Sequence, residues 1–121
     1  MKKIMLVEDN SLNARLIEHV LTRDDFEVTS FNNAEEAISA AAELLPDIIL
    51  MDIQLPGMDG LEATRKLKED PATRSIPIVA ITAHAMCGDE DRVMEAGCSG
   101  YLPKPINTRE LAASINSIIG E

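Results

Sequence analysis

Three short runs of the sequence are apolar almost throughout, and each is bounded by polar or turn residues. These runs are Ile4–Val7, Ile48–Met51 and Ile78–Ile81. Strands that are covered by helices on both faces have continuous apolar runs, whereas half-exposed strands alternate. Two weaker segments, Val28–Phe31 and Gly100–Leu102, are typical of edge strands. The pattern therefore predicts a parallel sheet with three central strands and two edge strands.

Segments with helical periodicity separate the predicted strands. The first predicted helix follows a cap at Asn10 or Ser11 and has an apolar stripe made of Leu12, Leu16, Ile17, Val20 and Leu21. The last predicted helix follows Asn107 or Thr108 and has an apolar stripe made of Leu111, Ile115, Ile118 and Ile119. The helices between them are expected at Ala34–Leu45, Leu61–Glu69 and Asp89–Ala96.

The alternation of strands and helices predicts an α/β fold, because parallel strands need helical crossovers that then cover both faces of the sheet. With the two weak strands at its edges, a five-stranded sheet fits the flavodoxin-like order 2-1-3-4-5. The 121 residues, 45 % of them hydrophobic, suit one domain with one core. Ligands of such sheets bind beyond the carboxyl ends of the strands, near the switch point between the first and third strands.

Reactive side chains stand at those carboxyl ends. After the first, third, fourth and fifth predicted strands come, in turn, Glu8 with Asp9, Asp52, Thr82 and Lys104. Converging carboxylates repel one another, and Mg²⁺ relieves the repulsion because it prefers a few carboxylate ligands together with retained waters. The carboxylate of Asp52 could then attack phosphorus and form an aspartyl phosphate. The hydroxyl of Thr82 and the ammonium group of Lys104 would bind phosphoryl oxygens.

Four stretches of the sequence, taken together, resemble the response-regulator receiver domains. They are Val7–Asn10, Asp52–Gly60, Thr82–Met86 and Lys104–Ile106. The resemblance covers essentially the whole chain. In detail, the chain is similar to single-domain cell-division regulators of the DivK type and to receiver modules of hybrid histidine kinases. The resemblance implies one CheY-like receiver domain over residues 1–121, without an output domain. It also implies a two-component phosphorelay function, in which a phosphoryl group passes from a phosphohistidine to an aspartate.

The resemblance assigns the modified residue and the metal ligands. Asp52 corresponds to the phosphoacceptor that becomes 4-aspartylphosphate, and it also belongs to the Mg²⁺ site. Asp9 corresponds to a direct metal ligand and Glu8 to a ligand that acts through water. Gln54 corresponds to the position whose backbone carbonyl binds the metal.

Further positions receive roles in phosphoryl binding, switching and timing. Thr82 and Lys104 correspond to the pair that binds the phosphoryl group, and together with the phosphoacceptor they form the catalytic set. Thr82 also acts with Tyr101, which corresponds to an aromatic residue that changes rotamer on activation. Gln54 and His84 stand where the family tunes the lifetime of the phosphoryl group. Without the resemblance, Tyr101 could be ordinary half-buried packing and His84 an ordinary exposed histidine.

The implied partners are proteins. A sensor histidine kinase or a histidine phosphotransfer protein would donate the phosphoryl group, and an effector would bind the face made by the fourth helix, the fifth strand and the fifth helix. A net charge of −10, with 21 acidic and 11 basic residues, argues against direct nucleic-acid binding. The apolar runs are too short for a signal peptide or a membrane span, so we expect a soluble, cytoplasmic protein with reduced Cys87 and Cys98.

Two other functions share part of the pattern. A magnesium-dependent phosphohydrolase resembling the haloacid-dehalogenase class also uses an aspartate nucleophile, but that class has it after the first strand and needs a cap domain. A flavin-binding electron carrier shares the strand order, but it needs a phosphate loop rich in hydroxyls and glycine where this chain has the acidic Glu8 and Asp9. We therefore expect a phosphoryl-accepting switch with intrinsic autophosphorylation and autodephosphorylation, and not a metabolic enzyme.

Overall fold

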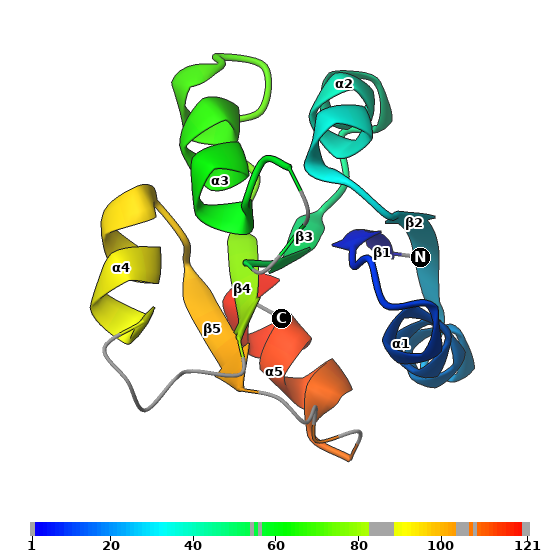
Figure 1. The fold of residues 1–121 in the computed structure, drawn as a ribbon. Coiled ribbons are helices and arrows are strands. Elements are labelled where there is room, and N and C mark those ends of the chain that lie inside the picture. The colour runs from blue at the N-terminus through cyan, green and yellow to red at the C-terminus, as the bar shows by residue number, and fades with distance from the viewer. Residues whose placement is uncertain are drawn as a thin grey trace.

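The computed structural model describes residues 2–53, 55, 57–82, 89–103, 107 and 109–119. Within them, five strands alternate with five helices (Figure 1). The strands are β1 (Lys2–Val7), β2 (Phe26–Phe31), β3 (Ile48–Asp52), β4 (Ile78–Thr82) and β5 (Gly100–Pro103). The helices are α1 (Ser11–Arg23), α2 (Ala34–Leu44), α3 (Gly60–Glu69), α4 (Asp89–Ala96) and α5 (Leu111–Ile119).

The strands form one parallel sheet in the order β2-β1-β3-β4-β5. Because β1 pairs with β2 on one side and with β3 on the other, Val7 lies opposite both Phe31 and Met51. The two weakly apolar strands, β2 and β5, lie at the edges. The predicted fold class and strand order are therefore confirmed.

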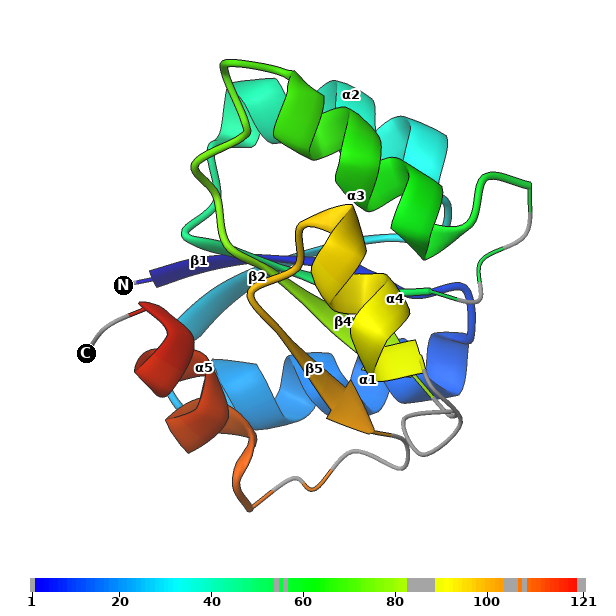
Figure 2. The ribbon, with the colours of Figure 1, turned by 90° about the vertical axis from the view of Figure 1, so that its left-hand side faces the viewer.

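Among the described residues, two hydrophobic clusters form the core of the domain, one on each face of the sheet. Figure 2 shows α2 and α3 on one side of the sheet and α1 and α5 on the other. Alternate strand residues face opposite ways, so Met5 and Ile49 pack with α2, α3 and α4, while Leu6 and Leu50 pack with α1 and α5. The sheet, buried on both faces as predicted, divides the interior of the domain into two layers.

Polar side chains define where three helices begin. The side-chain oxygen of Asn10 accepts a hydrogen bond from the backbone N–H of Leu12 at 3.0 Å and caps α1, so Ser11 is the first helical residue and not the cap. Asn33 caps α2 and Asp59 caps α3 in the same way. Each cap satisfies a backbone donor that has no partner inside the helix.

The apolar stripe of α1 is only partly buried. Its buried members are Ile17, Val20 and Leu21, whereas Leu12 is 75 % exposed and Leu16 is 47 % exposed. At about 3.6 residues per turn, the five residues of the stripe span about half of the helix circumference. The sheet covers a narrower arc than that, so only part of the predicted stripe is buried.

The ends of the other helices follow the sequence closely. α2 ends at Leu44, one residue before the predicted end, and Leu45 has left-handed backbone angles with a φ of 45°. α4 has the predicted bounds, and Gly97 follows it with a φ of 111°. α5 buries Leu111 and Ile115. In the part of the chain that the structure describes, no helix has both the length and the apolar character that a bilayer span requires.

Candidate functional site

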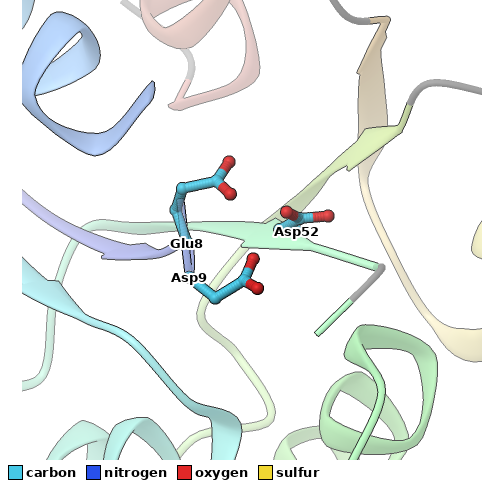
Figure 3. A group of neighbouring side chains, drawn as sticks. All are labelled: Glu8, Asp9 and Asp52. Carbon is cyan, nitrogen blue, oxygen red and sulfur yellow. The ribbon is translucent and has the colours of Figure 1, made fainter. Parts of the chain in front are cut away.

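The pairing of β1 with β3 brings three carboxylates together. Val7 lies opposite Met51 in the sheet, and an acidic residue follows each of them directly. Glu8 follows Val7, and Asp52 follows Met51. One carboxylate oxygen from each of Glu8, Asp9 and Asp52 lies within 4.8 Å of the others. Figure 3 shows these side chains gathered at the carboxyl ends of the two strands. The convergence expected from the sequence is therefore present.

Glu8 and Asp9 differ in how firmly they are held. The backbone N–H of Glu8 donates to the carbonyl oxygen of Phe31 at 3.0 Å, which extends the pairing of β1 and β2 by one residue. Its side chain is buried and accepts a hydrogen bond from the backbone N–H of Asn10 at 3.2 Å. Asp9 is exposed. The pair therefore offers one fixed interior carboxylate and one accessible carboxylate.

Asp52 is the last residue of β3 and is only 1 % exposed. The strand pairing continues past it, because the N–H of Ile53 donates to the carbonyl oxygen of Ile81 at 3.2 Å. On the other side, the N–H of Gly60 donates to the carbonyl oxygen of Ile53 at 3.2 Å. The backbone on the carboxyl side of Asp52 is therefore held between β4 and the start of α3.

Gly60 makes this arrangement possible. A Cβ atom at this position would lie 2.3 Å from the carbonyl oxygen of Asp52 and 2.6 Å from the Cα atom of Ile53, closer than nonbonded atoms can approach. The start of α3 thus packs directly against the peptide that follows Asp52. Sequence reasoning assigned Gly60 no role, and the signal that could have found it was a glycine directly before the predicted helix, next to Asp59.

Thr82 and Tyr101 lie on the neighbouring strands. Thr82 is the last residue of β4 and is fully buried. Tyr101 on β5 is opposite Ala80 and packs, partly buried, against the cluster beneath α2, α3 and α4. The predicted hydroxyl is therefore at the expected strand end, and the aromatic residue is on the adjacent strand. The other predicted site residues, Gln54, His84 and Lys104, lie outside the described residues.

An open cavity of about 410 Å³ adjoins the carboxylates. It lies against α1, the end of β2 and the start of α2, and Glu8 and Asp9 line it together with Ser11, Arg15 and Ser30. Solvent therefore reaches the acidic cluster from the side of α1. An all-oxygen donor set of clustered carboxylates, partly buried and partly open to water, fits a hard divalent cation of the Mg²⁺ type.

Comparison with known proteins gives a consistent result. Residues 4–116 match the response regulator receiver domain family. The polar-differentiation response regulator DivK of Brucella anthropi is 44 % identical over 120 residues, which cover 99 % of this chain and 98 % of that protein.

Solved structures are similar over the same length. The receiver domain of sensor histidine kinase PA1611 from Pseudomonas aeruginosa PAO1 has a TM-score of 0.92 and 38 % identity, covering 99 % of this chain and 98 % of that one. That structure has a magnesium ion coordinated in its active site cleft. The chemotaxis response regulator CheY4 of Vibrio cholerae has a TM-score of 0.91 at 24 % identity, over 98 % of both chains, and this likeness concerns the fold alone.

Proposed function

Because this chain belongs to the response regulator receiver domain family and is thus the receiver domain of a two-component response regulator, we propose that Asp52 is its phosphoacceptor. The observation that carries the proposal is the convergence of Asp52 with Glu8 and Asp9, within 4.8 Å, at the carboxyl ends of β1 and β3. The family supports a signalling switch, and not the phosphohydrolase or the flavin carrier. Residues 1–121 would act as one receiver domain, which the single sheet supports.

The proposed reaction is a transfer between two side chains. A carboxylate oxygen of Asp52 forms a bond to the phosphorus of a phosphohistidine, while the bond from phosphorus to the imidazole nitrogen breaks. The electron pair of the broken bond stays on the imidazole, and the product is an acyl phosphate on Asp52. The burial of Asp52 limits the access of water to this carboxylate. The same proposal includes slow transfer from small phosphodonors and slow hydrolysis of the product.

The acidic cluster would hold Mg²⁺. Asp9 is proposed as a direct ligand because it is exposed, Glu8 as a ligand through water, and Asp52 and the backbone carbonyl of Gln54 as the remaining protein ligands. When bound, the ion would neutralise the negative charge on the transferring phosphoryl group. The presence of magnesium in the related receiver domain of PA1611 supports this assignment. Thr82 and Lys104 are proposed to bind the phosphoryl oxygens, and Gln54 and His84 to tune the phosphoryl lifetime.

The output is proposed to be a change of surface. A phosphoryl group on Asp52 would attract the hydroxyl of Thr82, which ends the adjacent strand. Tyr101 would then turn inward, and the face made by α4, β5 and α5 would change shape. Receiver domains interact with histidine kinases or phosphotransfer proteins and with effectors, so a protein effector is proposed to bind this face. The net charge of −10 fits a protein partner better than a nucleic acid.

The experiment that tests the proposal is intact-mass measurement after incubation with acetyl phosphate and Mg²⁺. We expect the wild type to gain one phosphoryl group, and Asp52→Asn to gain none. Asp25→Asn is the matched control, because Asp25 is exposed, precedes β2 at the opposite end of the sheet and has a φ of 68° that asparagine tolerates. An unmodified wild type, or modification of Asp52→Asn at the wild-type rate, would contradict the proposal.

A further inference from the structure

Two buried hydrogen bonds meet at Thr64, one turn along α3 from Gly60. The hydroxyl of Thr64 donates to the carbonyl oxygen of Gly60 at 2.8 Å. The same hydroxyl oxygen accepts from the thiol of Cys98, with the sulfur 3.8 Å away. Thr64 is fully buried and Cys98 is 5 % exposed, so water does not compete for these contacts. The hydroxyl is therefore fixed from both sides.

The first turn of α3 connects Thr64 to the backbone of Asp52 through Gly60. Gly60 is at once the acceptor for Thr64, the donor to the carbonyl oxygen of Ile53, and the residue in contact with the Asp52 peptide. The contact at Gly60 has no spare room, because even a methyl group there would overlap the Asp52 carbonyl. A small rotation of the Gly60 peptide would therefore move the backbone that carries the Asp52 carboxylate.

A threonine inside a helix that bonds back to the carbonyl four residues earlier gives little or no helix stability, and it often bends the helix. Valine has the same shape, and for packing alone it would serve as well without a polar group to bury. The hydrogen bond from this hydroxyl to the carbonyl oxygen of Gly60 therefore suits a role in positioning the first turn of α3.

We propose that Thr64 and Gly60 are positioning residues for phosphoryl acceptance, and that they hold the backbone of Asp52 so that its carboxylate stays with those of Glu8 and Asp9. The inference rests on the proposed function of Asp52. Removal of the hydroxyl leaves the fold intact, but it lets the start of α3 shift and so slows phosphoryl acceptance and weakens magnesium binding.

Thr73 provides a matched control. It is 1 % exposed, and its hydroxyl donates to a backbone carbonyl, that of Leu67, at 2.6 Å. It lies after α3, away from the contact between Gly60 and Asp52. Thr73→Val therefore removes the same kind of buried hydrogen bond without touching the support of Asp52, and it reports the effect of lost stability alone.

The experiment compares Thr64→Val, Thr64→Ser and Thr73→Val with the wild type. The three readouts are the rate of phosphorylation by acetyl phosphate in Mg²⁺, the dissociation constant for Mg²⁺ alone, and the amide chemical shifts of Ile53 and Gly60 in metal-free protein. We expect Thr64→Val to be phosphorylated about tenfold more slowly, since small misplacements of reacting groups cost this much or more. It should also bind Mg²⁺ more weakly and shift both amides, whereas Thr64→Ser recovers most of the rate and Thr73→Val changes none of the three.

Wild-type behaviour of Thr64→Val, or equal losses in Thr64→Val and Thr73→Val, would overturn the inference while leaving the phosphoacceptor proposal standing. A wild type that takes no phosphoryl group on Asp52 would overturn both. If Thr64→Val does not fold, Thr64→Ala with Thr73→Ala as its control replaces the pair, and the same outcomes decide.

Discussion

The cap residue Asn10 holds Leu12 through a 3.0 Å hydrogen bond from the Leu12 backbone N–H to the Asn10 side-chain oxygen. This contact fixes an exposed leucine one residue into the first turn of α1, three positions after Asp9. Leu16 lies one turn further along the same face and is also exposed. An exposed apolar pair therefore lies in the first two turns of α1, close in sequence to Asp9.

We expect this pair to contact the protein that donates the phosphoryl group. Burial of a leucine side chain contributes about 1.5–3 kcal/mol, so Leu12→Ser should weaken donor binding roughly tenfold or more. Phosphotransfer from a phosphohistidine protein that serves the wild type should slow accordingly. Phosphorylation by acetyl phosphate should not change, because the carboxylates remain in place.

Leu45→Ser is the control for this prediction. Leu45 is 57 % exposed and precedes β3, at the end of the sheet away from the site. An equal slowing of protein-dependent transfer in Leu12→Ser and Leu45→Ser would mean that the exposed leucines of α1 are not at the donor interface.

Magnesium should stabilise the folded protein through the clustered carboxylates. Like charges at this separation repel by roughly 1–3 kcal/mol near a protein surface, and a ligand present at ten times its Kd adds about 1.4 kcal/mol to the free energy of unfolding. Asp9→Asn should lose this increment while remaining at least as stable as the wild type in metal-free buffer. Urea unfolding with and without Mg²⁺ measures both effects. A wild-type midpoint that does not respond to saturating Mg²⁺ would argue against the metal site.

The buried thiol of Cys98 predicts a loss of stability at alkaline pH. Burial raises the pKa of this thiol above its ordinary value of 9.0, although the charge of Lys68 opposes the rise. The unfolded chain releases the proton near pH 9 and the folded protein holds it longer. The thiol's contribution to the free energy of unfolding is therefore complete below pH 9. It is lost as pH rises through the folded-state pKa, by at most about 1.4 kcal/mol per pH unit.

Comparison with Cys98→Ala isolates this effect. Burial lowers the pKa of Lys68, which acts in the opposite direction but is present in both proteins. The difference in the free energy of unfolding between wild type and Cys98→Ala should thus shrink between about pH 8 and pH 10. A difference that stays constant over this range would show that Cys98 ionises equally in the folded and unfolded chains.

Thr82 should be needed for the response and not for the modification. Thr82→Ala removes the hydroxyl at the end of β4, so we expect it to accept a phosphoryl group but to transmit the change poorly. Amide chemical shifts with beryllofluoride and Mg²⁺ test this. In the wild type, shifts should extend over α4, β5 and α5, whereas in Thr82→Ala they should stay near Asp52. Wild-type shifts confined to the pocket would indicate a phosphoryl relay without a surface switch.

Much of this fold could be predicted because its signals are local. The three apolar runs identify the central strands, and Asn10 is one of the two cap candidates that the sequence offers for the first helix. The meeting of Glu8, Asp9 and Asp52 could also be predicted, since the carboxyl ends of parallel strands lie at one edge of the sheet. That inference needs only the strand order and no side-chain geometry.

The features that escaped prediction depend on surfaces that meet in three dimensions. Helical periodicity marks Leu12 and Leu16 as apolar but does not say how wide an arc the sheet covers. The roles of Gly60 and Thr64 come from the close approach of α3 to the end of β3, and no pattern along the chain records that distance. The assignments of Gln54, His84 and Lys104 lie outside the described residues and stay predictions.

The position of the acidic site on β1 and β3 has a consequence for hydrogen exchange. These strands are neighbours inside the sheet, with β2 flanking one side and β4 and β5 the other. An opening that parts β1 from β3 separates the ligands and loses a cation held by Glu8, Asp9 and Asp52, so the bound cation makes such openings rarer. Mg²⁺ should therefore slow deuterium uptake in those two strands, while amides of β5 and α5 that exchange through local openings keep their metal-free rates.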